Sequence, residues 1–199
     1  LNLGTLDHAA GPNCENVVIR GKGTIASGGR ELAEKIIADE QGHLKDYLAE
    51  HAALVAECEN ERTIPGRVRP RLINMSNCRN VWVHGLTLKN GASWNQHMIY
   101  SDNITTDHCR FVSEGVWNGD GWDPDSSTNC TLFACEFATG GDAVAIKSGK
   151  NPEGNKIGRP SAHIYVFDCR STAGHGICLG SEMSGGIEDV QIWDCDLTN

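Results

Sequence analysis

Hydrophobic and polar residues alternate within six short segments that recur along the chain. The segments all begin with Asn, His or Asp, at Asn16, Asn80, Asn103, Asn129, His163 and Asp189. Mostly hydrophobic residues stand one and three places after each start, and mixed residue types stand between them. Alternation with a period of two is typical of a β-strand that buries one face. We therefore expect five of these hydrophobic residues to point into a core: Val81, Ile104, Leu132, Val166 and Ile192.

The spacing of the segments predicts how the strands are arranged. From Asn80 onward the starts are 23, 26, 34 and 26 residues apart. A repeat of about 25 residues with strands and Gly/Asn-rich turns is typical of a solenoid, in which successive coils stack. The leucine pattern of leucine-rich repeats is missing, as are the ankyrin and tetratricopeptide patterns. The sequence therefore predicts an all-β fold, a right-handed single-stranded parallel β-helix.

Four of the nine cysteines share one column of this repeat, six places after a segment start: Cys109, Cys135, Cys169 and Cys195. Neighbouring strands lie ~4.8 Å apart, whereas the Cβ atoms of a disulfide lie ~3.8 Å apart, so we expect an internal stack of free thiols. No cysteine or histidine spacing typical of a zinc site occurs, and neither a metal nor a cofactor is expected. Reduced thiols, and a first segment without signal-peptide features, slightly favour a cytoplasmic over a secreted location.

Two stretches interrupt the repeat. Residues 30–58 are rich in Ala, Leu, Glu and Lys, with Leu32, Ile36 and Ile37 at helical spacing, and predict a helical insertion. Gly42 is expected to divide this insertion into two helices. Residues 150–160 form a Gly/Pro/Asn-rich loop with three cationic side chains. Because a solenoid needs capped ends, we expect residues 1–199 to form one β-helix domain that is incomplete at both ends.

Composition narrows the classes of partner. The 199 residues carry 17 basic and 26 acidic side chains, a net charge of −9, which disfavours nucleic acid as the main partner. No stretch approaches the ~20 apolar residues that a membrane-spanning helix needs, so no membrane partner is expected. The oligomeric state is left open.

Three glycine-rich strings stand in the strands that precede the aligned segments: NGDGWDPD, GGDAVAIKSG and GHGICLGSE. They contain Asp120, Asp142 and His175, which are 22 and 33 residues apart, close to one coil and to one coil plus the loop insertion. Residues one coil apart lie side by side on a β-helix, so this spacing predicts one exposed row. Carboxylates beside a histidine suit acid–base cleavage of a glycosidic bond. The same residue types also form turns, and the spacing alone leaves this alternative open.

Taken in order, these motifs resemble those of the polygalacturonases, the family 28 glycoside hydrolases of the pectin-lyase-like β-helix fold. That family carries Asn-Thr-Asp, Gly-Asp-Asp, Gly-His-Gly and Arg-Ile-Lys motifs along one groove. The chain has Asn118-Gly119-Asp120, Gly140-Gly141-Asp142 followed by AIKSG, and Gly174-His175-Gly176. It departs from the family in two ways, because Gly141 stands in the position of the general acid and no Arg-Ile-Lys motif occurs.

The resemblance implies an inverting hydrolase of α-1,4-linked galacturonic acid polymers or oligomers, acting in pectin degradation. It implies that Asp120 and Asp142 activate water and that His175 hydrogen-bonds and tunes the acid. It also suggests four substrate-binding residues: Asn118, Lys147, Ser148 and Lys150. Loss of a positioned acid costs ~10²–10⁴-fold, so Gly141 predicts impaired activity, with Asp123 as the nearest alternative acid.

Local charge and aromatic residues bear on the substrate. Four cations cluster near the proposed row: Lys147, Lys150, Lys156 and Arg159. They favour an anionic ligand in spite of the net charge, although a solvated loop is the alternative. Three tryptophans could stack on a sugar or pack in the core: Trp94, Trp117 and Trp122. Two other functions remain open, a polysaccharide lyase on the same fold and a non-catalytic carbohydrate-binding β-helix.

Overall fold

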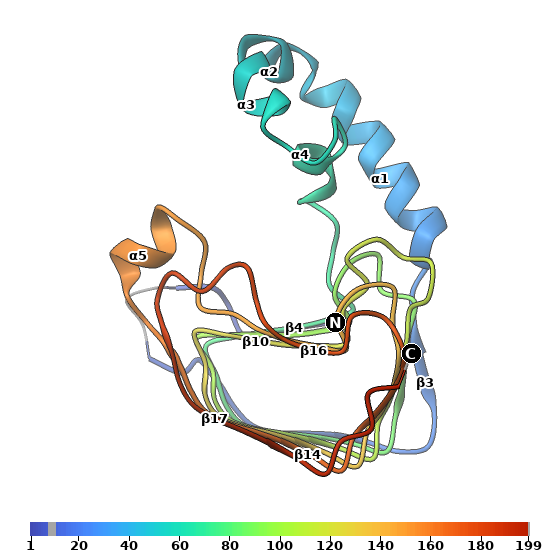
Figure 1. Cartoon of the computed structure of the whole chain (residues 1–199), viewed down its shortest axis with the longest axis vertical. Helices are drawn as coiled ribbons and strands as arrows, with labels where there is room; N and C mark the ends of the chain where they lie inside the picture. Colours follow the sequence, from blue (N-terminus) through green and yellow to red (C-terminus); the bar gives the residue numbers. More distant parts are fainter. Residues whose placement is uncertain (8–10, 199) are drawn as a thin grey trace.

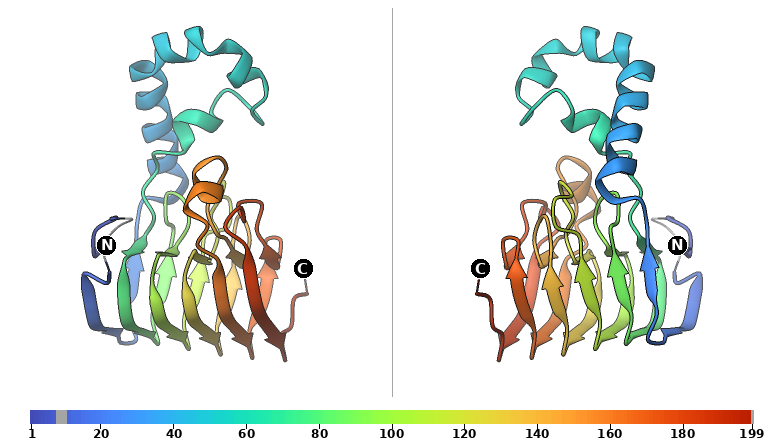
Figure 2. Two further views of the ribbon diagram at one scale, coloured as in Figure 1. Left: turned by 90° about the vertical axis from the view of Figure 1, so that its left-hand side faces the viewer. Right: turned by 90° about the vertical axis from the view of Figure 1, so that its right-hand side faces the viewer.

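Strands from successive coils lie side by side in three parallel sheets, which form the three walls of a right-handed β-helix (Figures 1 and 2). The computed structural model describes residues 1–7 and 11–198. Every strand pairing in it is parallel. The predicted fold class is therefore confirmed.

Each coil contributes one strand to sheet A and one to sheet B, and every coil but the last described one also contributes a strand to sheet C. Sheet A contains β1 (Asn2–Leu3), β4 (Ile73–Ser76), β7 (Gln96–Ile99), β10 (Trp122–Asp125), β13 (Val144–Ile146) and β16 (Ile177–Leu179). Sheet B contains β2 (Cys14–Arg20), β5 (Cys78–His84), β8 (Asp102–Asp107), β11 (Thr128–Phe133), β14 (Ser161–Phe167) and β17 (Ile187–Trp193). Sheet C contains β3 (Thr24–Ala26), β6 (Thr87–Lys89), β9 (Arg110–Val112), β12 (Glu136–Ala138) and β15 (Arg170–Ala173). The six segments recognised in the sequence are the strands of sheet B.

The predicted inward column is confirmed for four residues, which are at most 2% exposed: Val81, Ile104, Leu132 and Val166. Ile192, the fifth, is 44% exposed, so its predicted burial is wrong. It lies on β17, which is an edge strand of sheet B with no neighbour on its outer side in the described chain. A side chain of a solenoid is buried only when coils cover it on both sides.

The backbone explains why each repeat begins with Asn, Asp or His. All six starting residues have a left-handed conformation, with φ between 45° and 59°. Asn and Asp tolerate this region better than other residues with a side chain. The amide of Asn80 also donates to Asn16 Oδ1 over 3.0 Å, and the amide of Asn103 donates to Asn80 Oδ1 over 2.8 Å. The left-handed residue therefore recurs near the beginning of each sheet B strand, and the amides of the first three starts tie their coils together.

The cysteine column forms a stack inside the corner between sheets B and C. All nine cysteines are free. The backbone N–H of Cys109 donates to Cys135 Sγ over 3.4 Å, across one coil step. Burial raises the pKa of the Cys135 thiol and, to about 12, that of Cys130. The Cys130 and Cys135 thiols are therefore packing groups that stay protonated at neutral pH.

Alkylation of the denatured, unreduced protein is expected to label all four stacked cysteines, because their spacing follows the strand separation and not disulfide geometry. Peptide mass spectrometry gives the measurement. The sample denatured after reduction is the control, and its labelling should be the same. A disulfide joining any two of the four would contradict the packing described above.

The helical insertion occupies the first connection from sheet C to sheet A (Figure 2). It comprises α1 (Gly29–His43), α2 (Lys45–Glu50), α3 (Ala52–Ala56) and α4 (Thr63–Gly66). The insertion is thus confirmed but runs beyond the predicted residue 58. The expected break at Gly42 is wrong, because Gly42 lies inside α1 and the break comes at Leu44. One glycine costs a helix only ~1 kcal/mol, which a long helix tolerates.

The second interruption carries α5 (Glu153–Ile157), between sheets A and B. Gly158 ends this helix in the left-handed conformation, with φ at 59°. In the described part of the chain, no helix combines the length and apolar character needed to cross a membrane.

Candidate active site

Three of the connections that lead from sheet C to sheet A carry the predicted row. Asp120, Asp142 and His175 stand two residues before β10, β13 and β16. The backbone N–H of Asp142 donates to Asp120 Oδ1 over 3.2 Å, and His175 Nδ1 lies 3.0 Å from Asp142 Oδ1. The structure therefore brings the three residues together in the predicted order, one coil apart. The predicted exposure of the whole row is wrong, because His175 is exposed but Asp120 is only 5% exposed.

Glycines let these connections stack closely. A Cβ at Gly140 would lie 2.3 Å from Val116 O, and one at Gly174 would lie 2.3 Å from Gly141 O. Both contacts are with backbone and exclude a side chain. Gly141 differs, because its Cβ would meet a side-chain atom, Asp120 Oδ1, at 2.0 Å. The Asp120 carboxylate thus occupies space that a side chain at position 141 would need.

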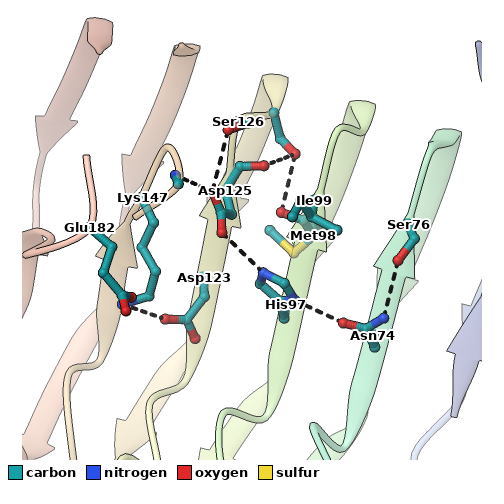
Figure 3. A network of polar contacts seen from close by, with 12 residues as sticks. Asn74, Ser76, His97, Met98, Ile99, Asp123, Asp125, Ser126, Lys147 and Glu182 are labelled. Carbon is teal, nitrogen blue, oxygen red and sulfur yellow. Dashed lines mark hydrogen bonds and ion pairs between the residues drawn. The ribbon is translucent and has the colours of Figure 1, made fainter. Parts of the chain in front are cut away.

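A buried lysine lies beneath the row. Lys147 is 4% exposed, and its Nζ lies 3.8 Å from Asp120, 3.5 Å from Asp123 and 3.8 Å from Glu182 (Figure 3). Nζ also lies 4.7 Å from the centre of the Trp94 ring. Burial lowers the pKa of Lys147, but the surrounding carboxylates outweigh burial and raise it overall. Lys147 is therefore a counter-ion within the groove floor, and its contact with a substrate carboxylate stays a prediction.

Asp123 is fully buried next to this lysine. Neither of its carboxylate oxygens has a hydrogen-bond partner among the described residues. Burial, and then the charge of Asp120, hold the pKa of Asp123 well above its usual range. Burial also raises the pKa of Asp120, against the opposing effect of Lys147. The catalytic role of Asp123 stays a prediction, and its side chain is not part of the groove lining.

Replacing Asp123 by asparagine should flatten the dependence of stability on pH. A carboxyl whose pKa is higher in the folded protein than in the unfolded chain stabilises the fold below pH ~4, and this contribution is lost as pH rises through the folded pKa. We expect Asp123→Asn to lose less stability than the wild-type protein as pH rises from 5 to 7, because the substitution removes a carboxyl whose pKa is raised by folding. Denaturant unfolding at both pH values measures the difference.

Asp189→Asn is the matched control for this measurement. Its exposed carboxylate has a lowered pKa because of a hydrogen bond from His163. It is therefore ionised in both the folded and the unfolded state between pH 5 and pH 7, and the substitution should leave the slope over this range unchanged. Identical slopes for Asp123→Asn and the wild-type protein would contradict the raised pKa of Asp123.

Above the lysine lies a groove of about 590 Å³. Its basic lining comes from Arg67, Arg69, Arg71, Lys147, Lys150 and His175, and its acidic lining from Glu59, Asp120, Asp142 and Glu182. Lys156 and Arg159 are not part of this lining, and Arg159 packs over Tyr100 at 4.7 Å instead. Of the predicted cationic cluster, the groove thus holds Lys147 and Lys150.

The other predicted substrate residues differ in exposure. Lys150 is exposed, whereas Ser148 is buried and its Oγ has no hydrogen-bond partner in the described structure. Asn118 lines the groove, and its Oδ1 accepts a hydrogen bond from Arg69 Nη2 over 2.8 Å. Substrate binding by these three residues stays a prediction.

Arg69 is a residue of the site that the motifs did not reveal. It is 3% exposed, and its guanidinium also donates to the carbonyl oxygens of Gly66 (2.6 Å), Ala92 (3.1 Å) and Trp117 (2.6 Å). Burial lowers its pKa to about 10. Arg69 therefore fastens the helical insertion to two of the connections that form the groove wall.

The three tryptophans separate into two roles. Trp122 is buried in the core of the β-helix. Trp94 and Trp117 line the groove, with the Arg71 guanidinium 4.4 Å above the first ring and that of Arg69 4.5 Å above the second. Arg71 Nε is buried and, within the described residues, lacks a hydrogen-bond partner. The groove thus presents a donor that a bound anion could satisfy.

One polar network lies on sheet A next to the groove, where the His97 ring packs 5.0 Å from the ring of Trp94. His97 Nδ1 lies 2.8 Å from Asn74 Oδ1, and His97 Nε2 lies 3.5 Å from Asp125 Oδ2 (Figure 3). Burial lowers the pKa of His97, although Asp125 opposes this effect. Within the described residues, the clusters with three possible metal ligands lie outside the groove.

Comparison with known proteins identifies the family of this scaffold. The model of the family described as "Glycosyl hydrolases family 28" matches residues 4–199. The chain belongs to glycosyl hydrolase family 28.

Similar proteins and structures are named as polygalacturonases or as a galacturonosidase. A probable polygalacturonase of Vitis vinifera is 39% identical over 129 residues, which cover 63% of this chain and 26% of that protein. An exo-poly-alpha-D-galacturonosidase of Dickeya chrysanthemi is 27% identical over 192 residues, covering 88% of this chain and 32% of that protein. A hyperthermoactive exopolygalacturonase from Thermotoga maritima superposes with a TM-score of 0.73 at 32% identity, over 92% of this chain and 44% of that one. This family 28 chain therefore spans less than half the length of each of the three relatives.

Proposed function

We propose that the complete protein hydrolyses α-1,4-linked galacturonan, at the groove that contains Asp120, Asp142 and His175. The observation that carries this proposal is the row itself: two carboxylates and a histidine, one coil apart, in a groove with basic side chains on a family 28 scaffold. Clustered carboxylates are what acid–base cleavage of a glycosidic bond requires.

In this mechanism Asp142 is the base that activates water. Its side chain is 21% exposed and can contact a water molecule in the groove, while His175 holds its Oδ1. Asp120 accepts the hydrogen bond from the Asp142 backbone and completes the water-activating pair. Inversion follows when water attacks from the face opposite the leaving oxygen. Because Gly141 supplies no acid, we propose that the leaving oxygen departs without a positioned proton donor and that turnover is slow.

Substrate binding is governed by local charge and not by the net charge of −9. Arg67, Arg71 and Lys150 line the groove and can pair with galacturonate carboxylates. The unpartnered Nε of Arg71 supports an anionic ligand in particular. Trp94, held between Arg71 and Lys147, offers its apolar surface beside them.

We further propose that the groove acts on chain ends. The helical insertion lines it through Glu59, Thr63, Gly66 and Arg67, and so supports a wall at one end of the row. The Thermotoga maritima relative is named as an exopolygalacturonase. Release of monomers or dimers from polygalacturonate, without intermediate-sized oligomers at early times, is the expected product pattern.

Incubation of the complete protein with polygalacturonate tests the proposed reaction. New reducing ends without ultraviolet absorbance support hydrolysis. Products with an unsaturated, ultraviolet-absorbing ring would instead show a lyase. A thermal shift with galacturonides but no products, even on prolonged incubation, would favour the non-catalytic carbohydrate-binding alternative.

A further inference from the structure

A second cluster of chemically active side chains lies at the corner between sheets B and C, which sheet A does not reach. His84 ends β5, Asp107 ends β8 on the next coil, and His108 follows Asp107 directly. Both histidines contact the same atom, Asp107 Oδ1, through Nδ1; the distance is 3.0 Å for His108, and the His84 contact is closer. None of the three lines the groove.

The coil geometry explains why these side chains converge. His84 and Asp107 are register partners on neighbouring strands. His108 has a left-handed conformation, with φ at 50°, which departs from the alternation of a strand and lets its ring turn back toward Asp107. One ligand atom from each residue lies within 4.8 Å of the other two. In a tetrahedral zinc site with bonds of ~2.0–2.1 Å, ligand atoms lie about 3.3 Å apart, so small side-chain movements suffice to close around an ion.

A tryptophan orients the carboxylate. Trp82 Nε1 donates to Asp107 Oδ2 over 2.9 Å, which leaves Oδ1 facing the two imidazoles. Hydrogen bonds of this kind to the non-ligating atom hold metal ligands in place in known sites. The Asp107 side chain is 7% exposed, whereas those of His84 and His108 are 38% and 59% exposed. An ion can therefore enter from solvent, and a water molecule can complete its coordination.

The fold itself does not require polar groups at this corner. In the same register row, the next three coils carry Phe133, Phe167 and Trp193. Their rings stack with centroids 5.1 and 4.5 Å apart. In the later coils, stacked aromatic side chains therefore fill this corner. In two earlier coils, His84, Asp107 and His108 stand at the same corner instead. The two imidazoles still contact this aromatic row, with their own centroids 5.4 Å apart and His108 edge-on to Phe133 at 5.9 Å. Packing therefore accounts for the rings but not for the Asp107 carboxylate between them.

We propose that His84, Asp107 and His108 bind a divalent transition metal ion, with Zn²⁺ as the fitting case. Two imidazoles and a carboxylate match the ligand preference of zinc, and three protein ligands leave one position for water. This site is independent of the proposed hydrolysis, because it lies on a different part of the coil from the groove.

Calorimetric titration of the metal-depleted protein with Zn²⁺, after alkylation of the accessible thiols, tests the proposal. His108→Asn is the informative variant, because Asn is the residue type that other coils place in left-handed conformations. His163→Asn is its matched control. His163 also has a left-handed conformation, with φ at 58°, and its Nδ1 lies 2.7 Å from the carboxylate of Asp189. The clusters of possible metal ligands among the described residues do not include His163.

The wild-type protein and His163→Asn are expected to bind one equivalent of Zn²⁺ with equal affinity. His108→Asn and His84→Asn should bind at least ~10-fold more weakly. Circular dichroism and thermal unfolding of the metal-free variants establish that each is folded. If the wild-type protein binds no Zn²⁺, or if all four proteins bind it equally, the proposed site does not exist.

Discussion

Replacing Gly141 by aspartate is expected to raise the rate of polygalacturonate hydrolysis by ~10²-fold or more, because it supplies the missing proton donor. Position 141 does not have a positive φ, so its backbone accepts a side chain. The new Cβ would lie 2.0 Å from Asp120 Oδ1, and the Asp120 carboxylate must therefore rotate to admit it. Release of reducing ends by the complete protein is the measurement.

Gly141→Ala separates the steric effect from the chemical one. Alanine displaces Asp120 in the same way but donates no proton, so its rate should not exceed that of the wild-type protein. Asp142→Asn in the Gly141→Asp background should remove the gain, since water then lacks its base. If Gly141→Asp gains nothing while the wild-type protein is already fast, the acid lies elsewhere, and the roles proposed for this row are wrong.

Replacing Lys147 by methionine is expected to destabilise the protein by about 3–5 kcal/mol, the usual result of breaking a buried ion pair from one side. Methionine keeps most of the volume of lysine but leaves the carboxylates of Asp120 and Asp123 without their nearest cation. For a protein of this size the melting temperature should fall by roughly 6 °C or more. Thermal unfolding at pH 7 measures the loss.

Lys150→Met is the matched control for this substitution. Lys150 is exposed on the rim of the groove, so its loss should weaken galacturonide binding but leave stability nearly unchanged. Adding Asp123→Asn to Lys147→Met should recover part of the stability, because it removes one of the two stranded carboxylates. Equal melting temperatures for Lys147→Met and Lys150→Met would show that Lys147 is not a buried counter-ion.

The strand pattern and the row of Asp120, Asp142 and His175 could be read from the sequence, because a solenoid converts spacing along the chain into neighbourhood in space. The same residue types recur at one coil's distance, so a short alignment within the chain reveals the register. The sequence also predicts the column of Asn, Asp and His residues that begin each repeat, for the same reason. It does not predict their left-handed backbone conformation. A second left-handed column, which includes Gly85, His108 and Ala134, stayed hidden because its residue types differ.

Burial on sheet A was the part that the sequence could not supply. Asp123 and Ser148 look like polar, solvent-facing residues of short strands, yet both are covered. The outer face of sheet A forms the groove floor. Side chains from the connections between sheets, such as Trp94, cover it. No motif marks Arg69, because its four acceptors lie in three separate connections. Such contacts depend on how the coils pack and not on any local pattern.

The pitch of the β-helix limits what its catalytic row can do. Equivalent side chains on adjacent coils repeat at ~4.8 Å, which is shorter than the ~6.5–9.5 Å between acid and base that inversion uses. A column with one carboxylate per coil can therefore hold a base and its helper, but the proton donor must come from a position beside the column. Position 141, next to Asp142 in the chain, is such a place. One substitution at such a position can therefore remove or restore the proton donor and change the catalytic rate. The spacing of the carboxylates in the column does not change, because the backbone sets it.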